Sequence, residues 1–197
     1  MRNLKELKKV KSIEELKRCG LPIPETIFIF DFEKQEKEID DFLVNKRIVT
    51  IRSDKENQTD FCPHRLRCER NNLKSFVKQL NATGYVAILQ RYVPIRRDRV
   101  SGNILILKNR VLVELMGTGP LTALNRDGKV LEQITLDKSL KEINHFGVRL
   151  ISRKEITGIL KKIKNFPLYK ILEFTLRPER VYFWQIRDDQ SAKSLEK

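Results

Sequence analysis

The segment "LEFTLRPERVYFWQIRD", residues 172–188, constrains the fold more than any other part of the chain. It consists of two runs rich in aromatic and aliphatic side chains, separated by a turn that contains Pro178. Runs of this composition on both sides of a turn are typical of a β-hairpin. Charged and amide side chains interrupt both runs, namely Glu173, Gln185 and Arg187. Their place in the hairpin depends on the register of its strands.

Register decides which side chains share a face, because a slip of one residue exchanges the two faces of a strand. A four-residue turn over 177–180 places Leu172 opposite Gln185 and Glu173 opposite Trp184, so that both faces mix charge with apolar bulk. A loop one residue shorter places Glu173 opposite Gln185 and makes the other face wholly apolar. That apolar face pairs Leu172, Phe174 and Leu176 with Ile186, Trp184 and Tyr182. We favour the shorter loop, although it lacks the usual glycine.

The favoured register gathers Glu173, Gln185 and Arg187 on one face, with Thr175 and Phe183 nearby. Carboxylate and amide oxygens are ligands for Mg²⁺, and a guanidinium binds two phosphoryl oxygens at once. The face therefore suits a cation and a phosphate. A Glu173–Arg187 salt bridge on a solvated sheet face explains the same residues, and both interpretations stay open at this point.

Composition limits the class of protein. A chain of 197 residues can form one domain, or two lobes that share a cleft, around a real core. No apolar run is long enough to span a bilayer and no signal peptide is evident, so we expect a cytoplasmic protein with no membrane partner. Three cysteines, an odd count, indicate free thiols. A formal net charge of +14 favours polyanionic partners, either nucleotides or nucleic acid.

Helical and strand patterns are mixed along the chain. Amphipathic periodicity predicts helices at 13–19, 33–46, 72–84 and 152–165. In the second of these helices Ile39, Phe42 and Leu43 are expected to face inward. Apolar runs predict further strands at 25–31, 47–53, 85–93 and 102–117. Ser12 and Glu15 have the spacing of a capping box for the first helix. We expect polar loops at 54–70 and 118–130. Helices combined with antiparallel strands indicate the α+β class.

Four stretches occur in the order found in the ATP-binding domain of the phosphoenolpyruvate synthase and pyruvate phosphate dikinase family. The strands "LEF" and "VYFWQIR" resemble that family's "IEW" and "lyiLQxRP" strands, and "VTIRSD" resembles its "VAVRSS". The stretch "KVKSIEELKRCGLPIPETIFI" resembles its opening "KGxNLxEMxxxGLPVPxGFxI". The stretch "ILQRYVPIRRDRVSGNILI" resembles "VQxMVxxxxSGVxFT". Together these matches cover most of the chain.

This resemblance implies an ATP-grasp fold, with two lobes of mainly antiparallel sheet flanked by helices and a nucleotide cleft between them. It implies an N-terminal lobe at 1–94, a C-terminal lobe at 95–188 and a flexible tail at 189–197.

The resemblance also implies roles for particular residues. Lys9 and Arg52 match positions that contact the triphosphate, and Arg187 matches a phosphate-contacting arginine. Glu173 and Gln185 match the residues that serve magnesium-ATP, so both are expected at the metal. The hinge beside the adenine is expected to consist of Gln90, Arg91, Tyr92 and Val93.

The sequence departs from the family pattern in places that bear on the chemistry. Ile171 stands where the family has an acidic residue, so one expected metal ligand is missing. Leu7, Lys8 and Lys9 replace a glycine-rich turn, which removes flexibility where the backbone would approach phosphate. The phosphohistidine and pyruvate-binding domains have no counterpart in the sequence. We therefore expect that this chain does not run the family's full reaction alone, and a partner subunit could carry the missing domains.

Other candidate residues support weaker hypotheses. Cys62, His64 and Cys68 have side chains that zinc prefers, but their spacing is unfamiliar and a fourth ligand, Cys19 or His145, would be distant in sequence. A catalytic Cys–His pair is less favoured still. The stretches "HRLRCER" and "PIRRDR" suit phosphate contacts or a solvated basic face. We expect Trp184 in the core and His145 in a loop.

These observations favour a purine-nucleotide-binding protein that takes ATP with Mg²⁺. It is either an ATP-dependent phosphotransferase with an unknown acceptor or a relative that only binds. Alternatives are a nucleic-acid-binding protein on the same scaffold and one subunit of a split phosphotransferase.

Overall fold

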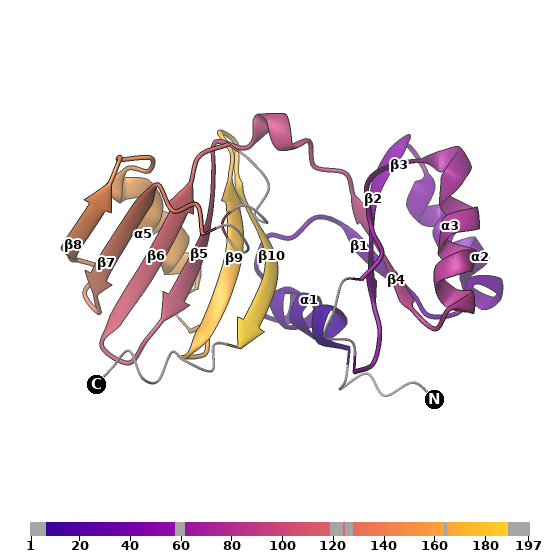
Figure 1. Ribbon diagram of the computed structural model, residues 1–197, viewed down its shortest axis with the longest axis horizontal. Helices are drawn as coiled ribbons and strands as arrows, with labels where there is room; N and C mark the ends of the chain where they lie inside the picture. Colours follow the sequence, from indigo (N-terminus) through magenta and orange to yellow (C-terminus); the bar gives the residue numbers. More distant parts are fainter. Residues whose placement is uncertain (1–6, 58–61, 119–123, 125–127, 164, 189–197) are drawn as a thin grey trace. The chain divides into compact units, whose positions relative to one another are not determined.

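The computed structural model describes residues 7–57, 62–118, 124, 128–163 and 165–188 (Figure 1). The chain divides into two compact units. Unit 1 comprises Met1–Glu14 and Pro24–Val93, and unit 2 comprises Glu15–Ile23 and Pro94–Lys197. Each unit contains one antiparallel sheet together with helical segments, so the α+β class is confirmed. The predicted tail at 189–197 lies outside the described residues.

Unit 1 is built on a four-stranded sheet in the order β1-β4-β2-β3. Its strands are β1 (Thr26–Ile29), β2 (Ile48–Asp54), β3 (Arg65–Glu69) and β4 (Val86–Arg91). Helices α2 (Phe32–Leu43) and α3 (Arg70–Ala82) cover one face of this sheet (Figure 1). The inward positions predicted for α2, Ile39, Phe42 and Leu43, are buried in the core that the helices share with the sheet. The opposite face of the sheet is therefore the one left for other contacts.

Helix α1 (Lys8–Arg18) begins about one turn earlier than its sequence predicts. The Asp54 carboxylate at the end of β2 accepts hydrogen bonds from the backbone N–H groups of Lys9 and Val10, at 2.7 and 3.0 Å. A carboxylate on these first amide groups satisfies donors that a helix start otherwise leaves open. Ser12 consequently lies inside the helix, and the predicted capping box at Ser12 is wrong.

The predicted loop at 54–70 contains strand β3, which pairs with β2 at the edge of the sheet. Only Cys68 of this strand is buried, so its sequence lacks the apolar alternation that marks most strands. Backbone pairing with β2 therefore stabilises a strand that the side-chain pattern of this segment does not predict.

Unit 2 is built on a six-stranded sheet in the order β10-β9-β5-β6-β7-β8. Its strands are β5 (Val100–Ile106), β6 (Arg110–Met116), β7 (Glu132–Asp137), β8 (Glu142–Gly147), β9 (Lys170–Leu176) and β10 (Val181–Asp188). Helix α5 (Arg153–Lys162) packs on one face and starts with a capping box formed by Ser152 and Glu155 (Figure 1). Strands β7 and β8 were not predicted, and His145 lies on β8 rather than in a loop. The predicted loop at 118–130 lies mostly outside the described residues.

Candidate functional site

The terminal hairpin combines both registers considered for it. Next to the turn, Leu176 pairs with Val181 and Phe174 with Phe183, which is the register of the four-residue turn. A β-bulge at Trp184 then shifts the ladder by one residue. Beyond the bulge Glu173 lies opposite Gln185, as predicted for the shorter loop.

The bulge also corrects two expectations about aromatic residues. Phe183 is fully buried in the core and does not lie beside Glu173, because it pairs with Phe174 on the apolar face. Trp184 was expected in the core but is half-buried, and its indole Nε1 donates a 2.8 Å hydrogen bond to Oγ1 of Thr175. An extra residue in one strand turns its side chain away from the regular alternation, and sequence spacing does not reveal it.

The polar side chains of the hairpin belong to a longer row on the sheet face away from the main core. Cross-strand partners share a face in an antiparallel sheet, so the pairing register defines the row directly. The register pairs Gln185 with Glu173, Glu173 with Asn103, Asn103 with Glu114, and Glu114 with Gln133. We call these five residues the polar row. It runs from β10 across β9, β5 and β6 to β7.

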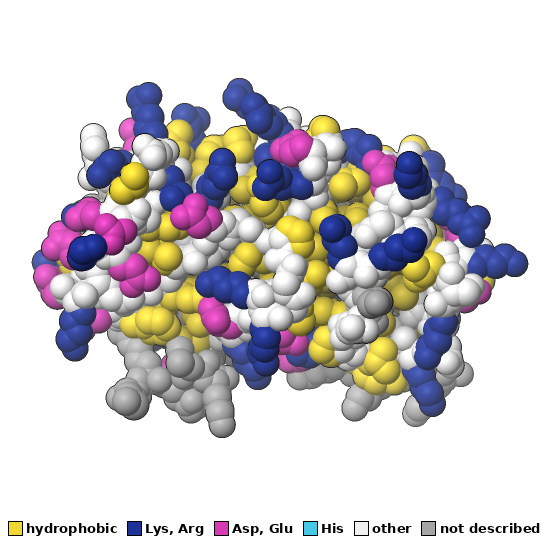
Figure 2. Space-filling model, turned by 180° about the vertical axis from the view of Figure 1, so that it is seen from behind, with side chains coloured by type: hydrophobic (Ala, Val, Ile, Leu, Met, Phe, Trp, Pro, Cys, Tyr) yellow, Lys and Arg dark blue, Asp and Glu magenta, His cyan; other side chains and the backbone are white. Residues whose placement is uncertain are grey.

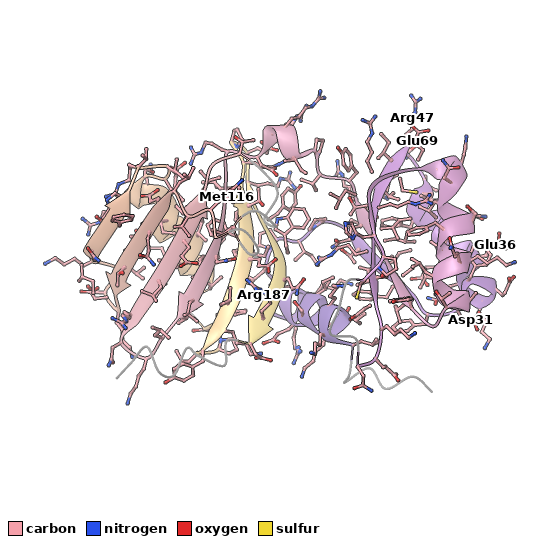
Figure 3. All side chains as sticks on the ribbon, in the orientation of Figure 1. Asp31, Glu36, Arg47, Glu69, Met116 and Arg187 are labelled. Carbon is pink, nitrogen blue, oxygen red and sulfur yellow. The ribbon has the colours of Figure 1, made fainter. Side chains whose placement is uncertain are left out.

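Arg187 belongs to the same face and neutralises one carboxylate of the row. It lies on β10 beside β9 (Figure 3), and its Nε is 2.7 Å from Oε1 of Glu173. This contact is an ion pair. The salt bridge considered from the sequence is therefore present.

In unit 1 the predicted phosphate contacts lie close to one another. Arg52 is half-buried on β2, and Asp54, two residues further on the same face, caps helix α1. This cap brings Lys9 to the end of β2, where its Nζ donates a 2.8 Å hydrogen bond to the carbonyl oxygen of Ser53. The end of β2 thus positions both Lys9 and Arg52, which are far apart in the sequence.

The predicted hinge residues divide between the two faces of the same sheet. Gln90 pairs with both Thr26 and Thr50, which puts it on the face of Arg52 and away from α2 and α3. Its side chain is buried, Nε2 donates to Oγ1 of Thr26 at 3.0 Å, and Oε1 has no hydrogen-bond partner among the described residues. Arg91 is exposed at the end of β4 and points to the other face by strand alternation. Tyr92 and Val93 follow the strand and are half-buried.

Sequence reasoning missed three members of the polar row, Asn103, Glu114 and Gln133. Their alternation with buried neighbours on β5 to β7 is a usable signal, since Val113 and Leu115 flank Glu114. The pairing of β5 with β9 joins segments about seventy residues apart and cannot be read from local pattern.

The donor atoms of the row suit magnesium better than zinc. Among the described residues no three His, Cys, Asp or Glu side chains converge as a metal-binding group. Carboxylate and amide oxygens are present instead, and these are donors that Mg²⁺ accepts in proteins. Cys68 is buried, and this burial raises the pKa of its thiol, although Arg65 opposes the effect. A thiol held protonated is a poor zinc ligand and a poor nucleophile.

Two surface hollows lie outside the predicted site residues. The larger, about 280 Å³, is lined by Arg65, Arg67, Cys68, Glu69 and Asn72 of unit 1. The other, about 230 Å³, is lined in unit 2 by residues of the segments around Cys19 and Phe166. Neither contains a predicted nucleotide contact, so the site assignment rests on donor chemistry and register.

Basic side chains are spread over the visible surface and interspersed with acidic ones, without a single basic stripe on the face shown (Figure 2). In the part of the chain that the structure describes, none of the helices has the length and apolar character needed to cross a bilayer.

No family model and no curated protein matches the chain. Solved structures do match. D-alanyl-alanine synthetase A from Vibrio cholerae is 7% identical with a TM-score of 0.59, over 93% of this chain and 55% of that chain. A RimK domain ATP-grasp protein from Sphaerobacter thermophilus is 11% identical with a TM-score of 0.53, over 97% and 63%. A RiPP-associated ATP-grasp ligase from Chryseobacterium gregarium, solved with ADP and a leader and core peptide, is 14% identical with a TM-score of 0.51, over 88% and 49%.

Likeness at such low identity concerns the fold. This chain spans between 49% and 63% of the length of these three neighbours. Two of the three neighbours are described as ATP-grasp proteins, and none of the three is described as a phosphoenolpyruvate synthase or a pyruvate phosphate dikinase. The chain has an ATP-grasp-like α+β fold.

Proposed function

We propose that this chain binds a purine nucleotide, ATP with Mg²⁺, through the polar row of unit 2 and uses it in an ATP-dependent reaction. The observation that carries the proposal is the register that puts Glu173 opposite Gln185, with Arg187 ion-paired to Glu173 on the same face. The ATP-grasp-like fold supports it, as does the ADP named in one neighbour's structure.

The residues of the row fit the chemistry of a metal-bound triphosphate. Glu173 and Gln185 would hold Mg²⁺ through carboxylate and amide oxygens. Arg187 would bind phosphoryl oxygens through its guanidinium group. Bound Mg²⁺ would neutralise part of the negative charge of the phosphates. Phosphoryl transfer depends chiefly on such positioning and neutralisation, so the proposed reaction class is transfer of a phosphoryl group to an acceptor of unknown identity.

Within unit 1, we propose Lys9 and Arg52 as phosphate contacts and Gln90, Tyr92 and Val93 as adenine contacts. Gln90 is the best supported of these, because a buried amide oxygen with no partner among the described residues can accept from an amino group. Arg91 stays in the proposed hinge, where its backbone rather than its side chain would contribute. A closer relationship to the phosphoenolpyruvate synthase and pyruvate phosphate dikinase domain rests on the sequence matches alone.

The nucleic-acid alternative is not proposed. Its support is the net charge of +14, and that charge serves a nucleotide equally well. A partner subunit carrying further domains likewise has no described feature in its favour.

Thermal unfolding with and without Mg²⁺-ADP tests the proposal. A ligand at a hundredfold excess over its Kd adds about 2.7 kcal/mol to the free energy of unfolding, which raises Tm by about 5–10 °C for a chain of this length. Trp184, the single tryptophan, lies beside Gln185 and provides a second readout by fluorescence.

Matched variants assign the site. Glu173→Ala and Arg187→Ala should each reduce the rise in Tm that Mg²⁺-ADP causes. Glu179→Gln, an exposed position in the hairpin turn, should keep it. The proposal fails if the wild-type protein shows no shift, and the residue assignment fails if the shift survives both site substitutions.

A further inference from the structure

We propose that the hollow between β3 and the start of α3 binds a phosphate group, either the free ion or a small phosphomonoester. This hollow has a volume of about 280 Å³ and is lined by Arg65, Arg67, Cys68, Glu69 and Asn72. It lies within unit 1, and none of its lining residues belongs to the proposed nucleotide site. The inference therefore goes beyond the proposed function and does not depend on it.

A β-bulge brings Arg65 to the side of the sheet where α3 lies. Between the pairs Cys68–Val49 and Arg65–Ile51, two residues of β3 stand opposite one residue of β2. Val49 and Ile51 both lie in the core under the helices, so Cys68 and Arg65 share that face. Regular alternation would put two residues three positions apart on opposite faces. The bulge thus re-aims a charged side chain toward the hollow.

The guanidinium of Arg65 is held in place by an aromatic ring. Its Cζ lies 4.2 Å from the ring centroid of Phe76 on α3. Stacking on a ring fixes the plane of a guanidinium and leaves the N–H donors at its edge available. A group oriented in this way loses less freedom on binding, and its fork of donors fits two phosphoryl oxygens.

Arg67 and Asn72 add donors that are not engaged elsewhere. Both side chains are exposed, and neither makes a hydrogen bond or ion pair with another described residue. Arg67 supplies a second charged fork, and the Asn72 amide supplies neutral N–H donors. The hollow therefore combines two guanidinium groups with an amide.

Positive charge is in excess at this corner of unit 1. Arg47 and Arg70 lie there as well, since the backbone N–H of Arg70 donates to the carbonyl oxygen of Arg47 at 3.2 Å. Figure 3 shows Arg47 next to Glu69, so four arginines share the corner with this carboxylate. On α2 and α3, by contrast, lysines are matched by carboxylates. The lysines in these ion pairs are Lys34, Lys37, Lys74 and Lys78.

The donor set fits a single phosphate group better than a long polyanion. A phosphate has three strong acceptor oxygens, enough for two guanidinium forks and an amide. Glu69 also lines the hollow and would repel further negative charge beside the first group. This repulsion acts against a polyanionic chain and tolerates one phosphate that the arginines neutralise.

Isothermal titration calorimetry of the full chain with glycerol phosphate, inorganic phosphate and glycerol tests the inference. We compare wild-type protein, Arg65→Gln, Arg67→Gln, Arg67→Lys and a charge-matched control. The control is Arg96→Gln, an exposed position on η2 (Ile95–Arg97) of unit 2.

Glycerol phosphate should bind the wild-type protein, and glycerol should not. Arg65→Gln and Arg67→Gln should each weaken binding at least about tenfold, as expected for loss of one charge-assisted hydrogen bond. Arg67→Lys keeps the charge without the fork and should retain part of the affinity. The control should bind like the wild type. Thermal unfolding checks that each variant is folded.

The two phosphate ligands identify the source of the group. Tighter binding of glycerol phosphate supports a phosphomonoester site, and equal or tighter binding of inorganic phosphate supports a site for the free ion. A wild-type protein that binds neither overturns the inference. So does unchanged affinity in both Arg65→Gln and Arg67→Gln, and so does an equal loss in Arg96→Gln, because net charge alone would then explain the effect.

Mg²⁺-ADP separates this inference from the proposed function. The rise in Tm that Mg²⁺-ADP causes should be the same in Arg67→Gln as in the wild type. A wild-type protein that binds glycerol phosphate through Arg67 but shows no response to Mg²⁺-ADP removes the proposed function and leaves the phosphate site standing.

Discussion

Arg187 and Glu173, on neighbouring strands of unit 2, form an ion pair with 2.7 Å between Nε and Oε1. The pair is unequal in its exposure to water, since the side chain of Glu173 is 10% exposed and that of Arg187 is 36% exposed. Loss of the arginine therefore leaves a nearly buried carboxylate without its cation.

We predict that Arg187→Gln lowers the free energy of unfolding by about 1–3 kcal/mol, the cost of an uncompensated charged group. The exposure of the arginine keeps the value below that of a fully buried pair. Urea unfolding measures it. The double variant Glu173→Gln with Arg187→Gln should recover most of the loss, and a double variant no more stable than the single one would contradict the explanation.

A second ion pair, Arg177 with Asp98, is far more buried. The two side chains are 5% and 7% exposed, Nε lies 2.9 Å from Oδ1, and the guanidinium also donates to the carbonyl oxygen of Pro94. We predict that Asp98→Asn costs about 3–5 kcal/mol, because a buried guanidinium loses its counter-ion. The exposed partner of the same arginine gives the control, and Glu179→Gln should stay within about 0.5 kcal/mol of wild type.

The Arg177–Asp98 pair as a whole should contribute little to the free energy of unfolding, so replacing both residues should cost less than replacing one. Burial raises the pKa of the Asp98 carboxyl even though Arg177 acts to lower it, which indicates a large desolvation cost. Asp98→Asn combined with Arg177→Met should therefore be more stable than Asp98→Asn alone. Denaturant midpoints of the two variants are compared at one pH, and a midpoint no higher in the double variant would contradict the prediction.

Two glycines offer opposite predictions for the same substitution. A Cβ at Gly102 would lie 2.5 Å from the backbone oxygen of Glu114 and 2.5 Å from Cδ2 of Leu115. Gly102→Ala should therefore destabilise the protein by about 1–3 kcal/mol through overpacking between β5 and β6. Gly158 in α5 has open space around its Cβ position, so Gly158→Ala should stabilise by about 0.5–1 kcal/mol. Thermal unfolding of both variants should show shifts of opposite sign.

The capping box of α5 predicts a dependence on pH. The hydrogen bond from Ser152 lowers the pKa of Glu155, with Arg99 as a further cause, while desolvation opposes it. A lowered folded-state pKa stabilises the protein above the ordinary glutamate pKa, about 4.3, and this stabilisation is lost as the pH falls below that value. The stability difference between wild type and Glu155→Gln, measured by urea unfolding, should be present at pH 7 and shrink below pH 4.3. A difference that stays constant with pH would contradict this assignment.

Much of the local structure follows from local pattern. The inward apolar positions of α2, the presence of helix α5 and the pairing of Glu173 with Gln185 were predicted from spacing and composition. Each depends on periodicity or hydrogen bonds between residues close in sequence. Strand β3 lacks such a pattern, and it was missed.

By itself the sequence determined the class of fold, the terminal hairpin and the side chains that its polar face presents, because hydrophobic alternation and turn chemistry act over a few residues. Tertiary structure decided where α1 begins, since its cap is Asp54, forty-five residues from Lys9. It also decided the bulge at Trp184 and the row that joins Glu173 to Glu114, since both arise when strands distant in the chain pair and pack. Cross-strand pairing has no local signature, because the residues that it joins become neighbours only once the sheet has formed.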